Sequence, residues 1–241
     1  MNAVLMLCRN SLALTKRAVA SVLAQDIQVT LYIIDNDSTD GTREWLAEDM
    51  LSWEPGQHYG PIRSWRFTPA KGVSASWNFG LGYLFNTAMC QRVLVVNNDL
   101  ELRPDAYRWL DLDGAPFVTA VSVDNPEAIK EGWAVSRRPH PDFSCFLIRR
   151  EVWEKVGKFD ESMVHYCSDG DYHLRMHQAG IEAYTIGIPF YHYASGTLKS
   201  ANEDEKARIL KQADQDRETF ARKWGCKMGS PEYYRLFNGT D

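Results

Sequence analysis

Three apolar runs in the first hundred residues each end abruptly in polar side chains, and this pattern constrains the fold more than any other feature. Residues 3–8, 29–35 and 93–96 have the unbroken apolar character of strands that are buried on both faces of a sheet. Segments 12–24 and 72–89, which lie between them, space their apolar residues as helices do. Strands that alternate with helices predict an α/β fold with a mostly parallel sheet.

The polar side chains at these strand ends form three clusters, far apart in the sequence. In open α/β sheets, ligands bind beyond the carboxyl ends of the strands, so we expect the clusters to converge on one rim. Neither a G-x-G-x-x-G nor a Walker A loop follows the strands, which argues against a common dinucleotide or P-loop site. The clusters are Cys8-Arg9-Asn10, Asp35-Asn36-Asp37 and Asn97-Asn98-Asp99.

The pattern changes after Pro104, where strands and helices become less regular. No internal repeat or flexible linker interrupts the chain, so we expect one domain over residues 1–200, with halves of about 1–103 and 104–200. Residues 201–241 are expected to form a C-terminal helical extension. The remaining predicted elements are strands at 62–67, 117–123, 143–148 and 182–186, a helix at 169–179, and a helix at about 203–224 with Ile209, Ala213, Phe220 and Trp224 on one face.

Charge and cysteine content exclude several classes of protein. The net charge is −5 and no long basic run occurs, so a broad nucleic-acid interface is not expected. The five cysteines are odd in number and lack a close pair, which favours reduced thiols in a cytosolic protein. The apolar run at 3–7 is too short for a signal peptide, and no run approaches the ~20 residues of a membrane span. We therefore expect a cytoplasmic protein without a transmembrane segment, with a peripheral membrane contact left open.

Several polar residues also have purely structural interpretations. Asn97-Asn98-Asp99 can begin a turn before Pro104, and the segment at 38–42 can cap the helix that follows it. Asp169 lies near a predicted helix start, where the helix dipole favours an acid. Asp171 and Arg175 have the i, i+4 spacing of a structural ion pair, and His173 and His177 are expected on the surface of the same helix.

Six motifs in order resemble family 2 glycosyltransferases, over roughly residues 3–197. The resemblance implies a GT-A fold, a Rossmann-like mixed, mostly parallel sheet flanked by helices, that uses a nucleotide-sugar donor. It assigns nucleotide binding to residues of about 1–103 and acceptor binding to about 104–200. The motifs are "YIIDNDSTDGT", "AKGVSASWNFGL", "VLVVNNDLELRPDA", "IRREVWEKVGKFDES", "SDGDYHLRMHQAG" and "YHYASGT".

The resemblance implies specific roles for the rim residues. Asp35 would hydrogen-bond the base of the donor, and the Cys8-Arg9-Asn10 turn would surround base and ribose. Asp99 matches the last acid of the family's DXD element, and His192 matches a histidine that completes the metal site or contacts the diphosphate. Asp169 matches the catalytic base, which takes the proton of the acceptor hydroxyl as that oxygen attacks the anomeric carbon. The further nucleotide-sugar-binding candidates are Asp37, Lys71, Gly72, Asn78, Asn97 and Asn98.

The sequence departs from the family at two positions. Asn97 stands where the first DXD acid is expected and offers only a neutral carbonyl, which predicts weak metal binding before the donor arrives. Ser168 replaces the glutamate that precedes the base and normally contacts the acceptor. Ser168 and Trp133 are the acceptor-binding candidates, since Trp133 lies in a polar segment and can stack on a sugar ring.

The resemblance implies an inverting glycosyltransferase that depends on Mn²⁺ or Mg²⁺ and uses a nucleoside-diphosphate sugar, with UDP as the expected nucleotide. The acceptor stays open among a glycan, a protein side chain, a small molecule and a modified nucleobase. Two alternatives remain: a GT-A domain that binds a nucleotide sugar without turning it over, and a nucleotidyltransferase that makes the nucleotide sugar.

Overall fold

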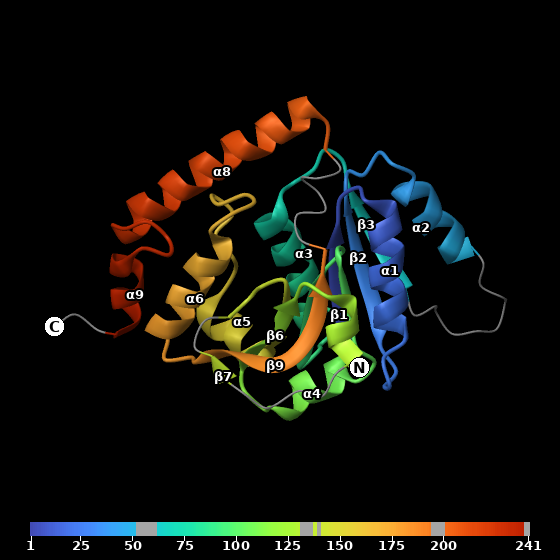
Figure 1. Cartoon of the computed structure of the whole chain (residues 1–241), viewed down its shortest axis with the longest axis horizontal. Coiled ribbons are helices and arrows are strands. Elements are labelled where there is room, and N and C mark those ends of the chain that lie inside the picture. The colour runs from blue at the N-terminus through green and yellow to red at the C-terminus, as the bar shows by residue number, and fades with distance from the viewer. Residues whose placement is uncertain (52–61, 131–136, 139–140, 194–200, 239–241) are drawn as a thin grey trace.

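The computed structural model describes residues 1–51, 62–130, 137–138, 141–193 and 201–238, in which helices flank a single sheet (Figure 1). None of the helices in these ranges is long and apolar enough to cross a bilayer. The strands are β1 (Ala3–Cys8), β2 (Thr30–Asn36), β3 (Ile62–Phe67), β4 (Arg92–Asn97), β5 (Leu100–Leu102), β6 (Phe117–Val123), β7 (Arg137–Arg138), β8 (Cys145–Arg149) and β9 (Ala183–His192). The helices are α1 (Leu12–Leu23), α2 (Thr42–Leu51), α3 (Val73–Asn86), α4 (Ala106–Leu112), η1 (Pro126–Lys130), α5 (Arg150–Val156), α6 (Ser168–Gln178), α8 (Glu203–Trp224) and α9 (Pro231–Asn238).

The nine described strands form one sheet in the order β3-β2-β1-β4-β8-β6-β9-β5, with β7 paired to β9. Strands β1 to β4 are parallel, β8 runs against β4 and β6, and β9 is parallel to β6. Six of the nine strands therefore run in one direction, which confirms the predicted mostly parallel α/β sheet.

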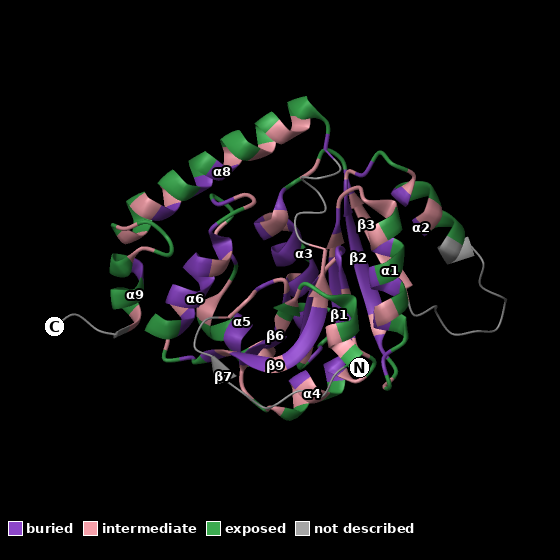
Figure 2. Ribbon diagram, in the orientation of Figure 1, coloured by how far each residue is buried: buried purple, intermediate pink, exposed green. Residues whose placement is uncertain are grey.

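The core lies on both faces of this sheet because its central strands are covered on both sides (Figure 2). Along β1, Val4 and Met6 belong to the apolar cluster that includes α1, whereas Ala3 and Leu5 belong to the cluster that includes α3. Each of these four side chains is fully buried. The alternation explains why β1 reads as a continuous apolar run.

Helices α8 and α9 form a C-terminal arm (residues 201–238) that packs against α6 (Figure 1). A separate apolar cluster joins the arm to the domain and contains Met163, Cys167, Leu174, Phe220 and Tyr233. The predicted inner face of α8 is confirmed, since Ala213 and Phe220 are buried.

Candidate functional site

The three polar clusters meet at one rim, as predicted. In the sheet register, Cys8 lies opposite Asp35 and Leu7 lies opposite Asn97. Asn10 links the first cluster to the other two segments, because its Oδ1 atom accepts a hydrogen bond from the amide of Thr39, two residues after Asp37, at 2.8 Å, and its carbonyl accepts one from the Asn98 side chain at 3.2 Å. The rim is thus a single surface built from segments almost ninety residues apart.

A cavity of about 730 Å³ lies over this rim, the first of two described here. It brings together predicted residues from all three clusters with the start of α8, which belongs to the arm. A volume in this range suits a small-molecule ligand. The predicted residues that line it are Arg9, Asn10, Asp37, Asn97, Asn98, Asp99 and His192.

Asp35 lies beneath the first cavity and is 2% exposed. One carboxylate oxygen accepts a hydrogen bond from the Ser38 amide at 2.9 Å, and the other is ion-paired with Arg66. Arg66 also reaches Asp37 at 3.1 Å, and Asp37 lines the cavity. Both oxygens of Asp35 therefore have partners within the protein, and Asp37 is the acid of this turn that the cavity exposes.

Asp99 and His192 come together at the edge of the first cavity. Leu100 of β5 pairs with His192 of β9, which places the His192 Nε2 atom 3.2 Å from the Asp99 Oδ1 atom. Two adjacent ligands of a six-coordinate Mg²⁺ ion, each at about 2.1 Å, are about 3.0 Å apart, so this pair fits one divalent ion. In the described ranges no group of three or more His, Cys, Asp or Glu side chains is placed to hold an ion.

The two asparagines before Asp99 differ in their surroundings. The Asn98 side chain donates to the Thr15 hydroxyl at 2.9 Å and to the Asn10 carbonyl at 3.2 Å, so it has a clear role in holding the rim together. The Asn97 backbone amide donates to the Ser144 carbonyl at 3.0 Å, and its side chain lines both cavities. Asn97 is the residue of the triplet best placed to contact two ligands at once.

Besides Asp35, four of the predicted nucleotide-sugar residues line neither cavity. The Asn78 amide is fully engaged with Phe159 and Glu161, and the amine of Lys71 lies 4.6 Å from the centre of the Phe67 ring. Gly72 allows a close approach of chain segments, because a Cβ atom there would lie 2.4 Å from the Val164 side chain. Cys8 is buried beside Asp35, and burial raises the pKa of its thiol. Asn78 therefore has hydrogen-bond partners within the protein, and its binding role stays a prediction.

A second cavity, of about 910 Å³, adjoins the first and contains Asp169 and Ser168. The two cavities share Val73, Asn97, His165 and Tyr166. Trp133, the other predicted acceptor residue, lies outside the described residues. The predicted base and the predicted diphosphate site therefore face neighbouring cavities across a common wall.

Burial dominates the ionisation of Asp169. It raises the pKa of this carboxyl above its ordinary value, and the nearby Asp142 carboxylate adds to the effect, while a hydrogen bond from the Gly170 amide opposes it. The helix start was expected to keep the group ionised, but desolvation outweighs that influence. A raised pKa makes the ionised carboxylate a stronger proton acceptor, which suits a general base.

The C-terminal arm covers both cavities, and sequence reasoning missed this contribution. Glu205 near the start of α8 accepts hydrogen bonds from Arg9 at 2.9 and 3.1 Å. Asp216 in the middle of α8 is fully buried and accepts from the amides of residues 164–166 at 2.8–3.0 Å. The sequence could have indicated this role of Asp216, because a carboxylate that falls on the apolar face of α8, between Ala213 and Phe220, needs hydrogen-bond partners when it is buried.

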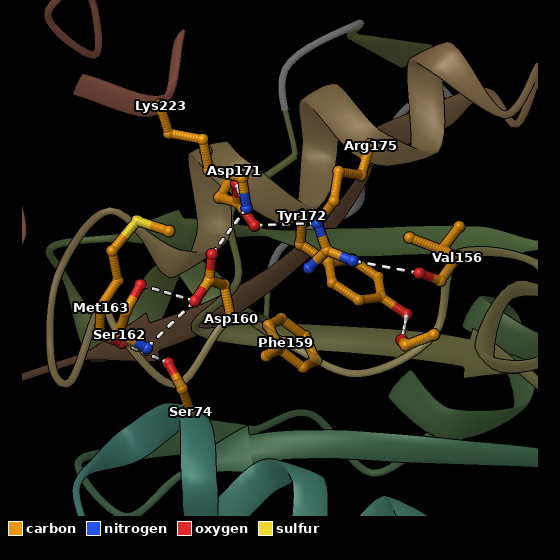
Figure 3. Close-up of polar contacts among 12 residues, drawn as sticks. Ser74, Val156, Phe159, Asp160, Ser162, Met163, Asp171, Tyr172, Arg175 and Lys223 are labelled. Atoms are coloured by element: carbon orange, nitrogen blue, oxygen red, sulfur yellow. Dashed lines mark hydrogen bonds and ion pairs between the residues drawn. The ribbon is translucent and has the colours of Figure 1, made fainter. Parts of the chain in front are cut away.

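Lys223 forms ion pairs that hold the C-terminal end of α8 against the domain (Figure 3). Its amine lies 2.6 Å from Asp160 and 2.7 Å from Asp171, so it bridges the turn before residue 163 and helix α6. Asp171 also pairs with Arg175 at 2.9 Å, which confirms the predicted i, i+4 pair. The Trp224 indole donates to Asp171 at 2.9 Å as well.

Helix α9 buries one histidine that was expected on the surface. His173 is 7% exposed, and its ring lies 4.4 Å from that of Phe237. The expectation was wrong because only one helix, at about 203–224, was located within the predicted C-terminal extension, whereas α9, which follows it, covers this side of α6. His177 is exposed, as predicted.

Comparisons with known proteins agree with this geometry. The low-salt glycan biosynthesis hexosyltransferase Agl10 of Haloferax volcanii is 23% identical over 179 residues, which cover 62% of this chain and 53% of that protein. The chain thus spans about half the length of this curated relative. A crystal structure of GalNAc-T7 with UDP, GalNAc and Mn²⁺ matches 99% of this chain and 53% of that chain, with a TM-score of 0.65 and 15% identity.

The mannosyltransferase PcManGT of Pyrobaculum calidifontis, in complex with GDP-Man and Mn²⁺, matches 98% of this chain and 67% of that chain, with a TM-score of 0.60 and 17% identity. These likenesses confirm the GT-A fold. The family model for glycosyl transferase family 2 matches residues 3–141, more than half of the sequence. This chain therefore belongs to glycosyl transferase family 2.

Proposed function

We propose that this protein transfers a sugar from a nucleoside-diphosphate sugar to an acceptor hydroxyl, with inversion at the anomeric carbon. One observation carries the proposal. The Asp99–His192 pair and Asp169 face two adjoining cavities that share Asn97 and Tyr166. A donor in the first cavity and an acceptor in the second would meet at this shared wall.

The donor would lie over the rim, with its diphosphate near Asp99 and His192. These two residues would hold a divalent ion, Mn²⁺ or Mg²⁺, which neutralises charge on the diphosphate when it is bound. Asp37 and Asn10 also line this cavity and would contact the nucleoside. The UDP and GDP-mannose in the two matched structures support a nucleotide-sugar donor, and we propose UDP as its nucleotide.

Asp169 would take the proton of the acceptor hydroxyl. Its carboxylate lies in the second cavity, whereas Asp99 lies in the first, so proton acceptor and leaving group are on different sides of the shared wall. A single displacement in which the acceptor attacks opposite the departing diphosphate inverts the anomeric centre. The proton passes to Asp169 as the new glycosidic bond forms.

The test is a screen of UDP-, GDP-, CMP- and dTDP-sugars for binding and slow hydrolysis, with Mn²⁺ and with a chelator. We expect one nucleotide class to bind in a metal-dependent way and its sugar to be released. Binding without any turnover, with hydrolysis and transfer both absent, would favour the non-catalytic alternative, which the neutral Asn97 and Ser168 support. Formation of a nucleotide sugar from a sugar phosphate and a nucleoside triphosphate would establish the nucleotidyltransferase instead.

A further inference from the structure

Tyr166 presents an aromatic surface where the two cavities meet. Tyr166 lines both cavities and is 38% exposed, and the guanidinium of Arg217, another residue of the second cavity, lies 5.9 Å from the centre of its ring. The second cavity also contains the rings of Trp77 and Phe143, which are nearly buried. An exposed ring in a concave site is a surface on which a flat or ring-shaped ligand can pack.

Asp216 fixes the backbone that carries this ring. Its Oδ2 atom accepts hydrogen bonds from the amides of His165 and Tyr166 at 2.8 and 2.9 Å, and its Oδ1 atom accepts from Val164 at 3.0 Å. From the opposite side, the Val164 carbonyl accepts from the Val73 amide at 2.8 Å. The backbone that carries Tyr166 is therefore held in place before any ligand binds, which reduces the ordering of this segment needed on binding.

Carboxylates outnumber cations in the second cavity. Of its described lining residues, Asp214 is paired with Arg217 at 2.8 Å, which leaves three carboxylates and one lysine. A phosphate or carboxylate on an acceptor would meet like charges here, and such contacts select against a wrong partner. Hydroxyl groups, in contrast, can donate to these carboxylates. The three carboxylates and the lysine are Asp142, Asp169, Glu218 and Lys227.

We propose that the acceptor is an uncharged sugar ring, packed against Tyr166 with its hydroxyl groups directed to the carboxylates of the second cavity. This inference rests on the proposed function, because it takes the second cavity as the acceptor site. It selects a neutral glycan from the acceptor classes that the sequence left open. It also makes Asp216 a positioning residue, which acts through the segment that carries Tyr166.

The experiment measures binding of the full chain to an array of neutral, phosphorylated and uronic acid glycans, with UDP and Mn²⁺ present. We expect neutral glycans to bind, and the phosphorylated form of the best neutral glycan to bind at least about tenfold more weakly. Glu218→Lys should reduce this discrimination, and Glu151→Lys, on the exposed face of α5, should leave it unchanged. Equal or tighter binding of the phosphorylated form would overturn the proposal.

Substitutions of Tyr166 test the packing surface. Tyr166→Ala should weaken binding of the neutral glycan about tenfold, and Tyr166→Phe should change it less than threefold. Tyr234→Ala removes a similarly exposed tyrosine outside both cavities and serves as the matched control. Glycan affinity that is unchanged in Tyr166→Ala would contradict the assignment.

Asp216→Asn tests the positioning role. The Asn side chain has an NH₂ group in place of one carboxylate oxygen, so it cannot accept hydrogen bonds at both positions. We expect glycan affinity to fall while nucleotide affinity changes little, and a loss of both together would make Asp216 merely structural. Glycan binding without nucleotide binding would refute the proposed transfer reaction and leave the second cavity a site for neutral glycans. Nucleotide binding with no neutral glycan bound would refute the proposed acceptor and leave the proposed nucleotide-sugar donor site intact.

Discussion

The Nε2 atom of His192 lies 3.2 Å from the Oδ1 atom of Asp99, although the two residues are 93 positions apart. The pairing of β5 with β9 produces this contact, since it sets Leu100 opposite His192. Neither residue would reach the other without that antiparallel pairing. Whatever binds there depends on the second half of the sheet as much as on the rim at β4.

Asp99→Ala should abolish metal-dependent donor binding and transfer together, because it removes the charged member of the pair. Asn97→Asp should tighten Mn²⁺ binding without donor, because it adds a charged oxygen ligand beside the pair. Isothermal titration with Mn²⁺, with and without UDP, measures both effects. Turnover that persists in the presence of a chelator would show that the metal assignment is wrong.

Asp35→Ala should weaken nucleoside-diphosphate binding and lower the free energy of unfolding by about 2–3 kcal/mol, because Arg66 keeps only Asp37 as a carboxylate partner. Nucleotide titration and urea denaturation give the two quantities. Asp40→Asn is the control, since Asp40 accepts from the Leu12 and Thr42 amides in the same turn but lines neither cavity. If nucleotide affinity stays within a factor of two of that of the parent protein, Asp35 stabilises the turn and does not bind the nucleotide.

Asp169→Asn should lower the rate of transfer by about 10²–10⁴, because it keeps the size of the side chain and removes the proton acceptor. Donor affinity should barely change, since Asp169 does not line the first cavity. Nuclear magnetic resonance of the product should show the anomeric configuration opposite to that of the donor. A product of retained configuration, or a parallel loss of donor binding and transfer, would each exclude this role.

The rate of transfer should rise with pH through the pKa of Asp169, because only the ionised carboxylate accepts a proton. Burial raises that pKa, so the midpoint of the rise should lie above the ordinary aspartate value of about 3.9. Asp142→Asn removes a neighbouring negative charge and should shift the midpoint to lower pH. A pH–rate profile of both proteins checks this, and a shift to higher pH in Asp142→Asn would contradict it.

Lys223→Met should destabilise the fold at neutral pH. Burial of Asp160 opposes ionisation, but hydrogen bonds from Lys223 and Ser162 prevail and lower its pKa to about 2. Because the folded pKa lies below the unfolded value of about 3.9, the pair stabilises the fold above pH 4, and the gain is lost as pH falls from about 4 to about 2.

The expected loss for Lys223→Met is about 1–2 kcal/mol at pH 7, less than the full shift implies because solvent screens the partly exposed pair. Lys206→Met replaces another lysine of α8, paired at the surface with Glu203, and should cost less. Urea denaturation at pH 7 and at pH 2.5 measures the difference. An equal loss at the two pH values would show that charge is not the cause.

Local patterns predicted the first half of the fold because each of its first three strands is followed by its own helix. The third strand was expected at residues 62–67, where β3 lies, and the three polar clusters met as the parallel arrangement required. The second half was less predictable, since β8 inserts antiparallel between β4 and β6. No local periodicity specifies that order, which depends on packing between distant segments.

The residues of the candidate site were also predictable only in part. The rim residues Asp99 and His192 were predicted through motifs, whereas Asp216 and Tyr166 depend on how the arm folds back over the domain. Asn78 fits a family motif, but its amide satisfies buried backbone groups of the neighbouring turn. A motif identifies the residue type at a position, and only the surrounding contacts determine what that side chain is free to bind.

The arm supplies one wall of each cavity from a single continuous stretch of sequence, whereas the opposite rim is assembled from distant strands. Exchange of this stretch alone, with Arg9, Asp160, Asp171 and their ion-pair partners kept, would alter one wall of both cavities without changing any strand of the sheet. Chimeras made at residue 201 would therefore vary the donor and acceptor walls together, on a rim that keeps its own residues. In such a library, a change of preference in either cavity would trace to a single segment of the last forty residues.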